Sequence, residues 1–371
     1  MESPLIKTVS LIEEQLRQHE NFGAQLFVSR NAETIADLAM GNAAPHTPMR
    51  TDTILPWLSS GKPIAAVAVA QLCEKQKLEL DDPVSKFIPP FGVLGKEAIT
   101  IRHLLTHTGG FRSADKIPES LNWTETITRI CQTPLEPDWI PGEKAGYHVS
   151  SSWFILAEIL QRISGTNFEN YVLENFFGPI GVANSRFTFS TSETTPSEKS
   201  MGRVYVSQGA DVTGHPTLNQ FDRLEECQPG SGARGPIRDL GKFYEFLLRR
   251  GWTRPKNLSG EFALKSETIR IFAQRHRIGL FDHTFLHTLD WGLGFIPDSN
   301  RYGMETVPYG YGRRCSPEAF GHSGAQSSCA FADPTHGLVV AWVFNFQPGE
   351  RAHQRRAREI NSAIYEDLKN S

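Results

Sequence analysis

The sequence predicts an α/β domain whose antiparallel sheet is built from both ends of the chain and flanked by helices, with a mostly helical region inserted between. Strand-like alternation occurs near the N-terminus and again near the C-terminus, whereas the middle carries helical spacing. The 371 residues suffice for one large domain, and there is no internal repeat or obvious linker. We therefore expect one domain over residues 1–371, with an α/β region at 1–56 and 233–371 and a helical insertion at 57–232.

The N-terminal part predicts a helix, a hairpin and a second helix. Residues 5–19 carry apolar side chains at spacings of three and four, the pattern of an amphipathic helix. GAQLFVS and TIADLAMG alternate like strands, and the polar segment RNAE between them is typical of a hairpin turn. From Lys62 to about Leu80 the pattern is helical again, and Pro83 lies in the segment that ends it.

The middle of the chain predicts two more helices and then an irregular segment. ITIRHLLTHTGG (99–110) has the pattern of a short helix that two glycines end, and SSWFILAEILQRISG (151–165) is a strongly apolar helix that ends at its glycine. Residues 184–232 are rich in Ser, Thr, Glu and Gly with weak periodicity. We expect them to form a long irregular loop over the surface, lining a cleft.

The C-terminal part predicts a helix, several strands and a closing helix. IRDLGKFYEFLLRRG (237–251) has helical spacing. DWGLGFI, AFADP and GLVVAWVFN have the composition of strands, and a tight turn at Asp333–Gly337 joins the last two. Residues 351–369 carry apolar positions at helical spacing, so a helix closes the chain.

Composition excludes several classes of function. The net charge of −3 leaves no basic or acidic excess that would favour nucleic acid or an anionic membrane as partner. The basic run RAHQRRARE is interpreted as a solvated helix face. The five cysteines are far apart and form no CxxC pair, which predicts neither a disulfide framework nor a zinc site. Without an apolar signal core or a run of about 18 apolar residues, the expected location is cytoplasmic.

A serine and a lysine stand three positions apart at the head of an apolar helix, in PWLSSGKPIAAVAVAQL. Residues three apart on a helix share a face, so Ser59 and Lys62 face each other, whereas Ser60 and Lys62 diverge. A serine hydroxyl is a weak nucleophile that needs a base, and a lysine amine serves when burial lowers its pKa. By itself the S-x-x-K spacing is short and common, and an N-cap serine with a solvated lysine is the better interpretation of it.

Two further motifs occur in order at predicted element boundaries. PGEKAGYH places Tyr147 just before the apolar helix, and FGHSGAQSS places His322, Ser323 and Gly324 at the start of a predicted strand. The three motifs together resemble the serine β-lactamase and penicillin-binding protein superfamily, with the closest likeness to its class C-like branch of esterases and transesterases. Long segments such as LELDDPVSKFIPPFG and PGSGARGPIRDLGKFYEFLLRRG agree with that family in order. The resemblance implies a β-lactamase-like fold over most of the chain.

The resemblance also implies a role for each motif residue. Ser59 attacks a carbonyl and is acylated, Lys62 shares its proton, and Tyr147 is the partner base. The implied oxyanion hole consists of the backbone N–H groups of Ser59 and Ala325. No cofactor or metal is implied. The implied partner is a small-molecule ester or thioester, with an alcohol or amine as acceptor in the transfer version of the reaction.

Two departures from the family pattern affect the expected substrate. The tyrosine motif of β-lactamases usually carries Asn two positions on, where this chain has Val149. The last triplet often begins with a lysine that holds a substrate carboxylate. Here it begins with His322, which at an ordinary pKa of about 6.5 is largely neutral at pH 7. Both departures favour esters or thioesters over β-lactams and D-alanyl peptides.

Several residues are candidates for substrate binding. Phe111 and Trp123 are expected to line an apolar acyl pocket, whereas Trp153 fits core packing better. His148 lies next to Tyr147, and a surface position is the favoured interpretation, with contact to the site as the alternative. The triplet residues complete the expected set: His322, Ser323 and Gly324.

Other patterns in the chain offer competing interpretations. GHSGA approaches the G-x-S-x-G nucleophile elbow, but strands follow it, where that elbow requires a helix. HLLTH and HTFLH have the i, i+4 spacing of helical metal ligands, yet neither has the glutamate of H-E-x-x-H or a clear third ligand. The predicted function is therefore a serine esterase with an acyl-enzyme intermediate. The alternatives are a biosynthetic acyltransferase and a catalytically silent binding module of the same fold.

Overall fold

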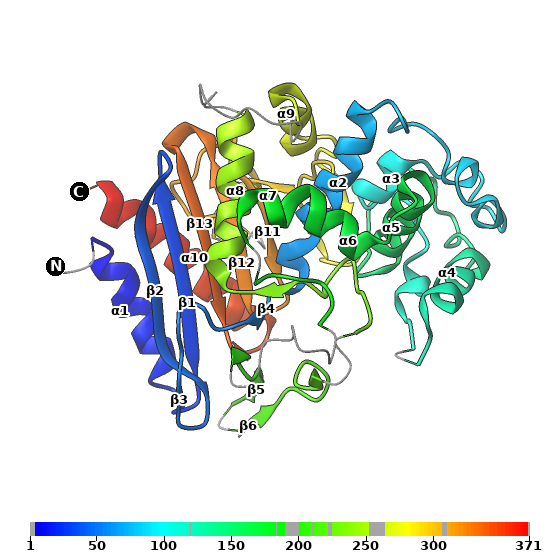
Figure 1. The fold of residues 1–371 in the computed structure, drawn as a ribbon. Helices are drawn as coiled ribbons and strands as arrows, with labels where there is room; N and C mark the ends of the chain where they lie inside the picture. The colour runs from blue at the N-terminus through cyan, green and yellow to red at the C-terminus, as the bar shows by residue number, and fades with distance from the viewer. Residues whose placement is uncertain are drawn as a thin grey trace.

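Strands from the two ends of the chain lie side by side in one antiparallel sheet, as the sequence predicts (Figure 1). The computed structural model describes residues 4–118, 120–182, 184–189, 200–209, 211–221, 225–251, 264–305 and 310–369. The seven strands have the order β10-β11-β12-β13-β1-β2-β3. Their bounds are β1 (Gly23–Arg30), β2 (Glu33–Ala44), β3 (Thr47–Pro48), β10 (Ile296–Pro297), β11 (Phe320–Gly324), β12 (Ser328–Asp333) and β13 (Leu338–Phe344).

The hairpin β1–β2 follows from local sequence. Asn31 and Ala32, the two residues between the strands, have φ angles of 52° and 67°, and turns of this left-handed kind match the twist of paired strands. Along β1 the side chains alternate between two hydrophobic cores, Leu26 and Val28 in one and Phe27 in the other. The sheet is therefore covered on both faces.

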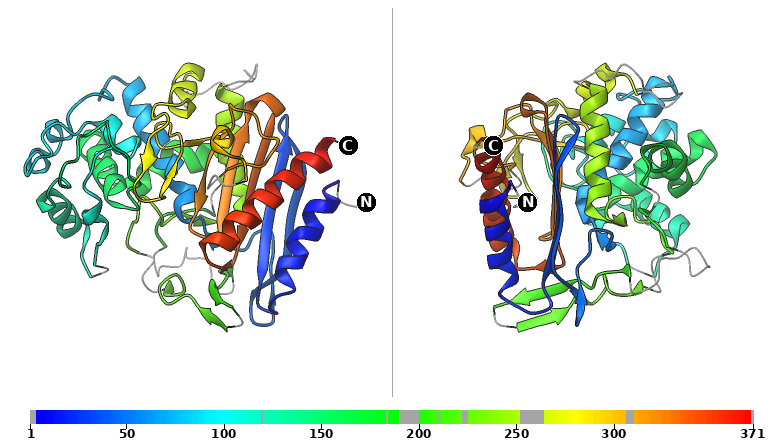
Figure 2. Two further views of the ribbon diagram at one scale, coloured as in Figure 1. Left: turned by 180° about the vertical axis from the view of Figure 1, so that it is seen from behind. Right: turned by 60° about the vertical axis from the view of Figure 1, so that its left-hand side comes forward.

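Helices supply that cover (Figure 2). α1 (Ile6–Leu16) and α10 (Glu350–Lys369) contact each other on one face, and α8 (Ile237–Gly251) packs on the opposite face against β1, β12 and β13. Gly241 allows α8 to come this close, since a Cβ at this position would lie 2.2 Å from the ring of Phe27.

The predicted helical region lies on the side of α8 that faces away from the large sheet (Figures 1 and 2). Its helices are α2 (Lys62–Glu74), α3 (Ile101–Leu105), α4 (Trp123–Gln132), α5 (Ser151–Ser164), α6 (Phe168–Val172) and α7 (Gly178–Ile180), with a π-helical turn at Leu173–Phe177, and α9 (Ser266–Ala273) lies beside them. Short 3₁₀ turns occur at Leu58–Gly61, Val84–Lys86, Pro89–Phe91, Arg112–Asp115, Asn300–Tyr302 and Pro334–His336. α2 is buried on all sides from Lys62 to Leu72, which explains why its sequence is apolar without a polar stripe.

Small sheets complete the fold. β4 (Leu55–Pro56) pairs with β7 (Arg234–Gly235), and β8 (Phe281–Asp282) pairs with β9 (His287–Thr288). β5 (Tyr205–Gln208) pairs with β6 (Asp211–Gly214) and, in parallel, with β14 (Phe346–Gln347). The structure thus corrects the prediction that 184–232 is wholly irregular, although 190–199, 210 and 222–224 lie outside the described residues.

Other predicted boundaries are also wrong. The helix expected to reach Leu80 ends at Glu74, because Gln76 has a φ of 53° and the N–H of Lys77 returns to the carbonyl of Leu72 at 3.0 Å, which closes the helix end. Within DWGLGFI only the final isoleucine is part of a strand. The triplet beginning at His322 ends β11, where the sequence placed it at the start of a strand.

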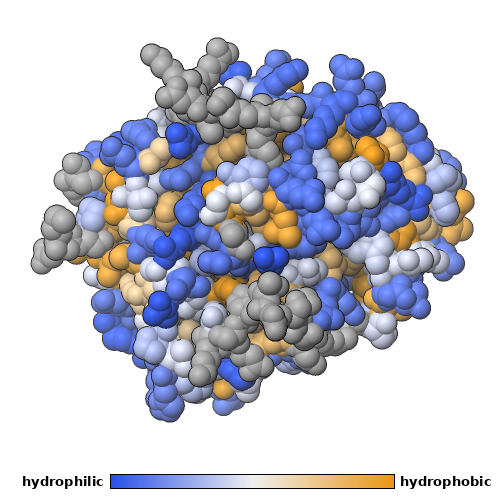
Figure 3. All heavy atoms as spheres, viewed as in Figure 1, coloured by the Kyte–Doolittle hydropathy of each residue, from blue (hydrophilic) through white to orange (hydrophobic). Residues whose placement is uncertain are grey.

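The helices among the described residues are too short or too polar to cross a lipid bilayer. On the face seen in Figure 3, hydrophilic and hydrophobic residues are interspersed.

Candidate active site

Ser59 lies in a tight turn that joins β4 to α2. The backbone of this turn is fixed by the N–H of Trp57, which donates to the carbonyl of Ala233 at 2.9 Å, and by Leu58, which has an unusual φ of 52°. A non-glycine residue in the left-handed region costs about 1–2 kcal/mol, so the surrounding contacts must hold it there. Ser59 is partly exposed, whereas its neighbour Ser60 is buried. The turn therefore presents one hydroxyl to solvent.

Lys62 begins α2 directly beneath that hydroxyl. Its Nζ donates to Ser59 Oγ at 2.8 Å and to the carbonyl of Gly230 at 2.8 Å. The side chain is fully buried, and this burial lowers the pKa of Lys62 to about 7, against the opposing effect of the Asp115 charge. The amine and the ammonium forms are therefore both populated near neutral pH.

Tyr147 approaches the same hydroxyl from the segment before α5. Its Oη donates to Ser59 Oγ at 3.0 Å, and Lys62 Nζ lies 5.3 Å from the centre of its ring. Burial raises the pKa of Tyr147 well above its ordinary value, so the resting group is a phenol. Three side chains that are far apart in the sequence are thus joined through Ser59 Oγ.

Asp115 holds the backbone that follows the tyrosine. Its Oδ1 accepts the N–H groups of Ser150 at 3.0 Å and Ser151 at 2.7 Å, and its Oδ2 accepts the N–H of Val149 at 2.9 Å. Burial raises the pKa of Asp115, but the nearby His148 and the hydrogen bonds to Ser150 and Ser151 outweigh it and lower the pKa below its ordinary value. The residue fixes the start of α5 and with it the position of Tyr147.

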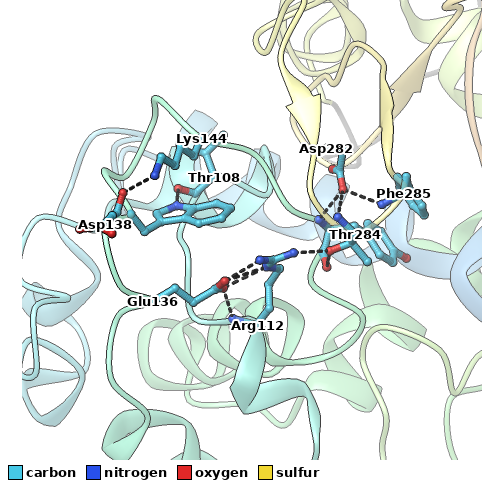
Figure 4. Close-up of polar contacts among 10 residues, drawn as sticks. Thr108, Arg112, Glu136, Asp138, Lys144, Asp282, Thr284 and Phe285 are labelled. Atoms are coloured by element: carbon cyan, nitrogen blue, oxygen red, sulfur yellow. Dashed lines mark hydrogen bonds and ion pairs between the residues drawn. The ribbon is translucent and has the colours of Figure 1, made fainter.

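Asp282 holds the tyrosine itself. Its Oδ1 accepts the N–H of Tyr147 at 3.1 Å, and Figure 4 shows further bonds to the N–H groups of Thr284 and Phe285. Its Oδ2 pairs with Arg277 at 3.0 Å, and both side chains are buried. Breaking a buried pair by removing one partner leaves an uncompensated charge, so this pair constrains the hairpin beneath Tyr147.

A second arginine supports the same segment (Figure 4). Arg112 Nε donates to Glu136 Oε1 at 2.9 Å, and Arg112 Nη1 donates to the hydroxyl of Thr284 at 3.1 Å. That hydroxyl donates to the carbonyl of Tyr147 at 3.0 Å. Sequence reasoning missed these supporting residues, because no motif distinguishes them from surface charges. Of the groups that support the trio, only the carbonyl of Gly230 lies in a segment that the sequence analysis singled out, which is the glycine-rich turn PGSG.

The end of β11 lies against the serine turn. A Cβ on Gly324 would lie 2.4 Å from the carbonyl oxygen of Trp57, so only glycine permits this approach. The next residue, Ala325, is exposed. Ala325, the second residue of the predicted oxyanion hole, therefore follows a strand end that lies against the turn carrying Ser59.

His322 of the same strand is buried beside the trio. Its Nδ1 lies 2.7 Å from the carbonyl of Ser323, and its ring centre lies 6.1 Å from that of Tyr147. Burial and the nearby Lys62 lower the pKa of His322 to about 3, so the imidazole is neutral at physiological pH. A neutral imidazole cannot replace the cationic lysine that often begins this triplet.

Some of the predicted binding residues lie away from this site. Ser323 faces Cys329 across the β11–β12 ladder, on the side of the sheet that α10 covers. The favoured surface position of His148 is wrong, because the residue is fully buried. Its N–H donates to His107 Nδ1 at 3.0 Å, and its ring centre lies 4.3 Å from that of Phe111. Phe111 is fully buried too, in the core, which argues against its expected place on a pocket wall.

Two neighbouring pockets lie on this side of the molecule, and the nearer one is lined by residues next to the trio in the sequence rather than by the trio itself. The proximal pocket, of about 320 Å³, is bordered by Leu58, Val149, Gly232 and Arg234 among others. The distal pocket, of about 460 Å³, includes Trp123 in its wall. Both pockets share three lining residues: Leu121, Glu226 and Gln228. The proximal pocket therefore lies beside the turn that carries Ser59.

The two histidine pairs have structural surroundings. His103 Nδ1 accepts the N–H of Thr100 at the start of α3, and His107 lies in the core. His283 and His287 lie in the β8–β9 hairpin, so their i, i+4 spacing is not helical. Across the part of the chain that the structure describes, no three metal-ligating side chains gather.

The fold and the three motifs define a protein of the serine β-lactamase and penicillin-binding protein superfamily, as the sequence predicts. The sequence profile of the Beta-lactamase family matches residues 9–364, and the chain belongs to that family. It is 29% identical over 315 residues to Esterase EstB of Burkholderia gladioli, with 77% of this chain and 78% of that protein covered. It is 23% identical over 321 residues to a putative D-alanyl-D-alanine carboxypeptidase of Escherichia coli K12, covering 80% of this chain and 69% of that one. The solved structure of EstCE1, described as a hydrolase with promiscuous acyltransferase activity, has a TM-score of 0.80 at 18% identity, covering 98% of both chains.

Proposed function

We propose that the protein is a serine hydrolase of small-molecule esters or thioesters that forms a covalent acyl-serine intermediate. One observation carries the proposal. The partly exposed Ser59 Oγ accepts hydrogen bonds from both Lys62 Nζ, at 2.8 Å, and Tyr147 Oη, at 3.0 Å. An N-cap serine with a solvated lysine would give neither the buried amine nor the third partner.

The difference between the two pKa values assigns the first proton transfer. Lys62, with a pKa of about 7, has an amine form ready to accept a proton, whereas the pKa of Tyr147 is raised so far that a phenolate is not available. Lys62 therefore accepts the proton of Ser59 as its Oγ bonds to the carbonyl carbon. This reverses the emphasis of the sequence prediction, in which Tyr147 was the base.

Collapse of the tetrahedral intermediate requires a proton for the leaving oxygen or sulfur. The Tyr147 phenol lies at Ser59 and supplies that proton, and the Lys62 ammonium then restores the phenol. The developing oxyanion is held by the N–H groups of Ser59 and Ala325, and each such donor is worth roughly 3–4 kcal/mol of barrier. Water then attacks the acyl carbon and releases the acyl group from Ser59. In this step Tyr147 takes a proton from the water as it passes its own to Lys62, and Lys62 returns a proton to Ser59.

Two residues that differ from the β-lactamase pattern, at positions 149 and 322, indicate the substrate class. Val149 has no amide to hold a peptide-like group, and the buried neutral His322 has no charge to hold a carboxylate at that point of the strand. The similarity to Esterase EstB supports the same class. EstCE1 is described as both a hydrolase and an acyltransferase, and this supports transfer to an alcohol or amine as the second candidate function.

Turnover of p-nitrophenyl butyrate by the wild type and by Ser59→Ala tests the proposal. We expect hydrolysis by the wild type and a rate at the uncatalysed background for the variant. Product analysis with added alcohols or amines then separates the two candidates, since a transferase gives acylated acceptor in proportion to acceptor concentration. A properly folded wild type that turns over no ester or thioester would leave the binding module as the remaining interpretation.

A further inference from the structure

The proximal pocket contains a buried arginine that the proposed reaction does not use. Arg234 lies in β7, where its Cα is opposite Pro56 of β4, three residues before the nucleophile. Its backbone is held on the other side by bonds to Arg186 at 2.9 and 3.0 Å. The side chain is only 5% exposed and borders the pocket. This location places Arg234 in the wall of a pocket that also includes Leu58, the residue before the proposed nucleophile.

The guanidinium has few partners of its own. Arg234 Nη2 donates to the carbonyl of Leu218 at 3.0 Å, and among the described residues Nε and Nη1 have no hydrogen bond. Within the same part of the chain, no carboxylate forms an ion pair with Arg234. Burial lowers the pKa of Arg234 to about 10, which still leaves the group cationic at neutral pH.

A buried cation without an anion is costly to desolvate, and proteins seldom retain one without a partner. The acidic side chains of the same pocket do not supply it. Asp115 is occupied by three backbone N–H groups at the Val149 end, and Glu226 is exposed, at the junction with the distal pocket. An anion on the substrate is therefore the natural partner, and a guanidinium fork matches a carboxylate geometrically.

We propose that Arg234 is a specificity-determining residue that binds a carboxylate carried by the ester substrate in the proximal pocket. This inference rests on the proposed function and narrows its substrate class to anionic esters. In this proposal the anion is recognised in the pocket beside Leu58, away from His322 in β11. The carboxylate can belong to the acyl part or to the leaving group, and paired substrates distinguish the two.

The test compares matched acid and methyl-ester substrates in each enzyme. For the acyl part the pair is p-nitrophenyl hydrogen glutarate and p-nitrophenyl methyl glutarate. For the leaving group the pair is 4-carboxyphenyl butyrate and 4-(methoxycarbonyl)phenyl butyrate. In the wild type we expect the ratio of kcat/KM, acid over ester, to favour the acid in one of the pairs. In Arg234→Gln that ratio should fall by about tenfold or more, and Arg234→Lys should retain part of it.

Arg17→Gln is the control, because Arg17 is an exposed residue at the C-terminal end of α1. It should leave both ratios at the wild-type value. Each ratio is internal to one protein, so a variant that is partly unfolded does not alter it. Equal ratios in the wild type and Arg234→Gln for both pairs would overturn the inference while leaving ester hydrolysis intact. Calorimetric titration of glutarate into Ser59→Ala, with and without Arg234→Gln, provides a binding measurement that does not depend on turnover. We expect the binding to weaken by about tenfold or more with the second substitution, and equal affinities would count against the inference.

Discussion

The pKa of Lys62 predicts the pH dependence of acylation. At a pKa of about 7, about half of the Lys62 side chains are amines at pH 7, whereas a lysine with the ordinary value of 10.5 would be about 0.03% amine. Burial is therefore worth a factor of about 10³ in the concentration of the reactive form at that pH. Below pH 7 the rate should fall about tenfold per unit, and above pH 8 it should be flat.

The assay is kcat/KM for a neutral p-nitrophenyl ester from pH 5.5 to 9, corrected for spontaneous hydrolysis. Histidines beside the trio do not produce an inflection near 7, because burial lowers the pKa of His322 to about 3 and also lowers that of His148. Replacing Asp115 by Asn removes a charge that raises the pKa of Lys62, so the inflection should move to lower pH. An inflection near 10, or a rate that does not depend on pH, would refute the role given to Lys62.

Three further substitutions test other parts of the structure. Tyr147→Phe removes the proton donor to the leaving group. With an alkyl ester, whose alcohol leaves only when it is protonated, steady-state kinetics should show kcat lower by about 10²–10⁴ with little change in KM; an unchanged kcat would exclude that role. Lys62→Met removes a buried ammonium that destabilises the fold. This destabilisation is complete below pH 7 and absent above about pH 10.5, because the pKa of Lys62 is about 7 in the folded protein and about 10.5 in the unfolded chain. Denaturant unfolding should therefore show the variant more stable by about a few kcal/mol at pH 6, and the difference should shrink towards pH 10. Asp282→Asn leaves Arg277 buried without its partner and should lower the free energy of unfolding by about 3 kcal/mol. Asp81→Asn, which breaks an exposed pair, is the control and should lower it by less than about 1 kcal/mol. Equal losses in the two variants would contradict the account of the buried pair.

The parts of the fold that could be predicted are those whose signal is local. The β1–β2 hairpin, α5 and α10 each have a periodicity that extends over the whole element, and the structure confirms them. The joining of N-terminal and C-terminal strands was inferred from their order along the chain, and it too is correct.

What could not be predicted depends on pairing between distant segments. β5 lies inside a stretch without periodicity, and it is a strand because it pairs with the adjacent β6 and, in parallel, with Phe346 and Gln347 of β14 near the other end of the chain. β7 is a strand for the same reason, through β4. Such short strands are stabilised by their partners, so their own sequences carry little signal.

The candidate site divides in the same way. Ser59, Lys62 and Tyr147 were found because each stands in a recognisable motif. Asp115 and Asp282 position the tyrosine through backbone N–H groups, and an aspartate in a loop has no spacing that reveals such a role. The burial of His148 also escaped prediction, since it depends on Phe111 and His107, which lie some forty positions earlier in the sequence.

The most direct test of the account is to locate the adduct that a fluorophosphonate forms with the protein. Ser60→Ala is the matched control for Ser59→Ala, because Ser60 is the adjacent hydroxyl but is buried against Ser328 Oγ at 3.0 Å. Intact mass and peptide mapping should show one phosphonyl group on Ser59 in the wild type and in Ser60→Ala, and none in Ser59→Ala. An adduct that persists in Ser59→Ala, or a folded wild type that stays unlabelled, would contradict the claim that Ser59 is the nucleophile.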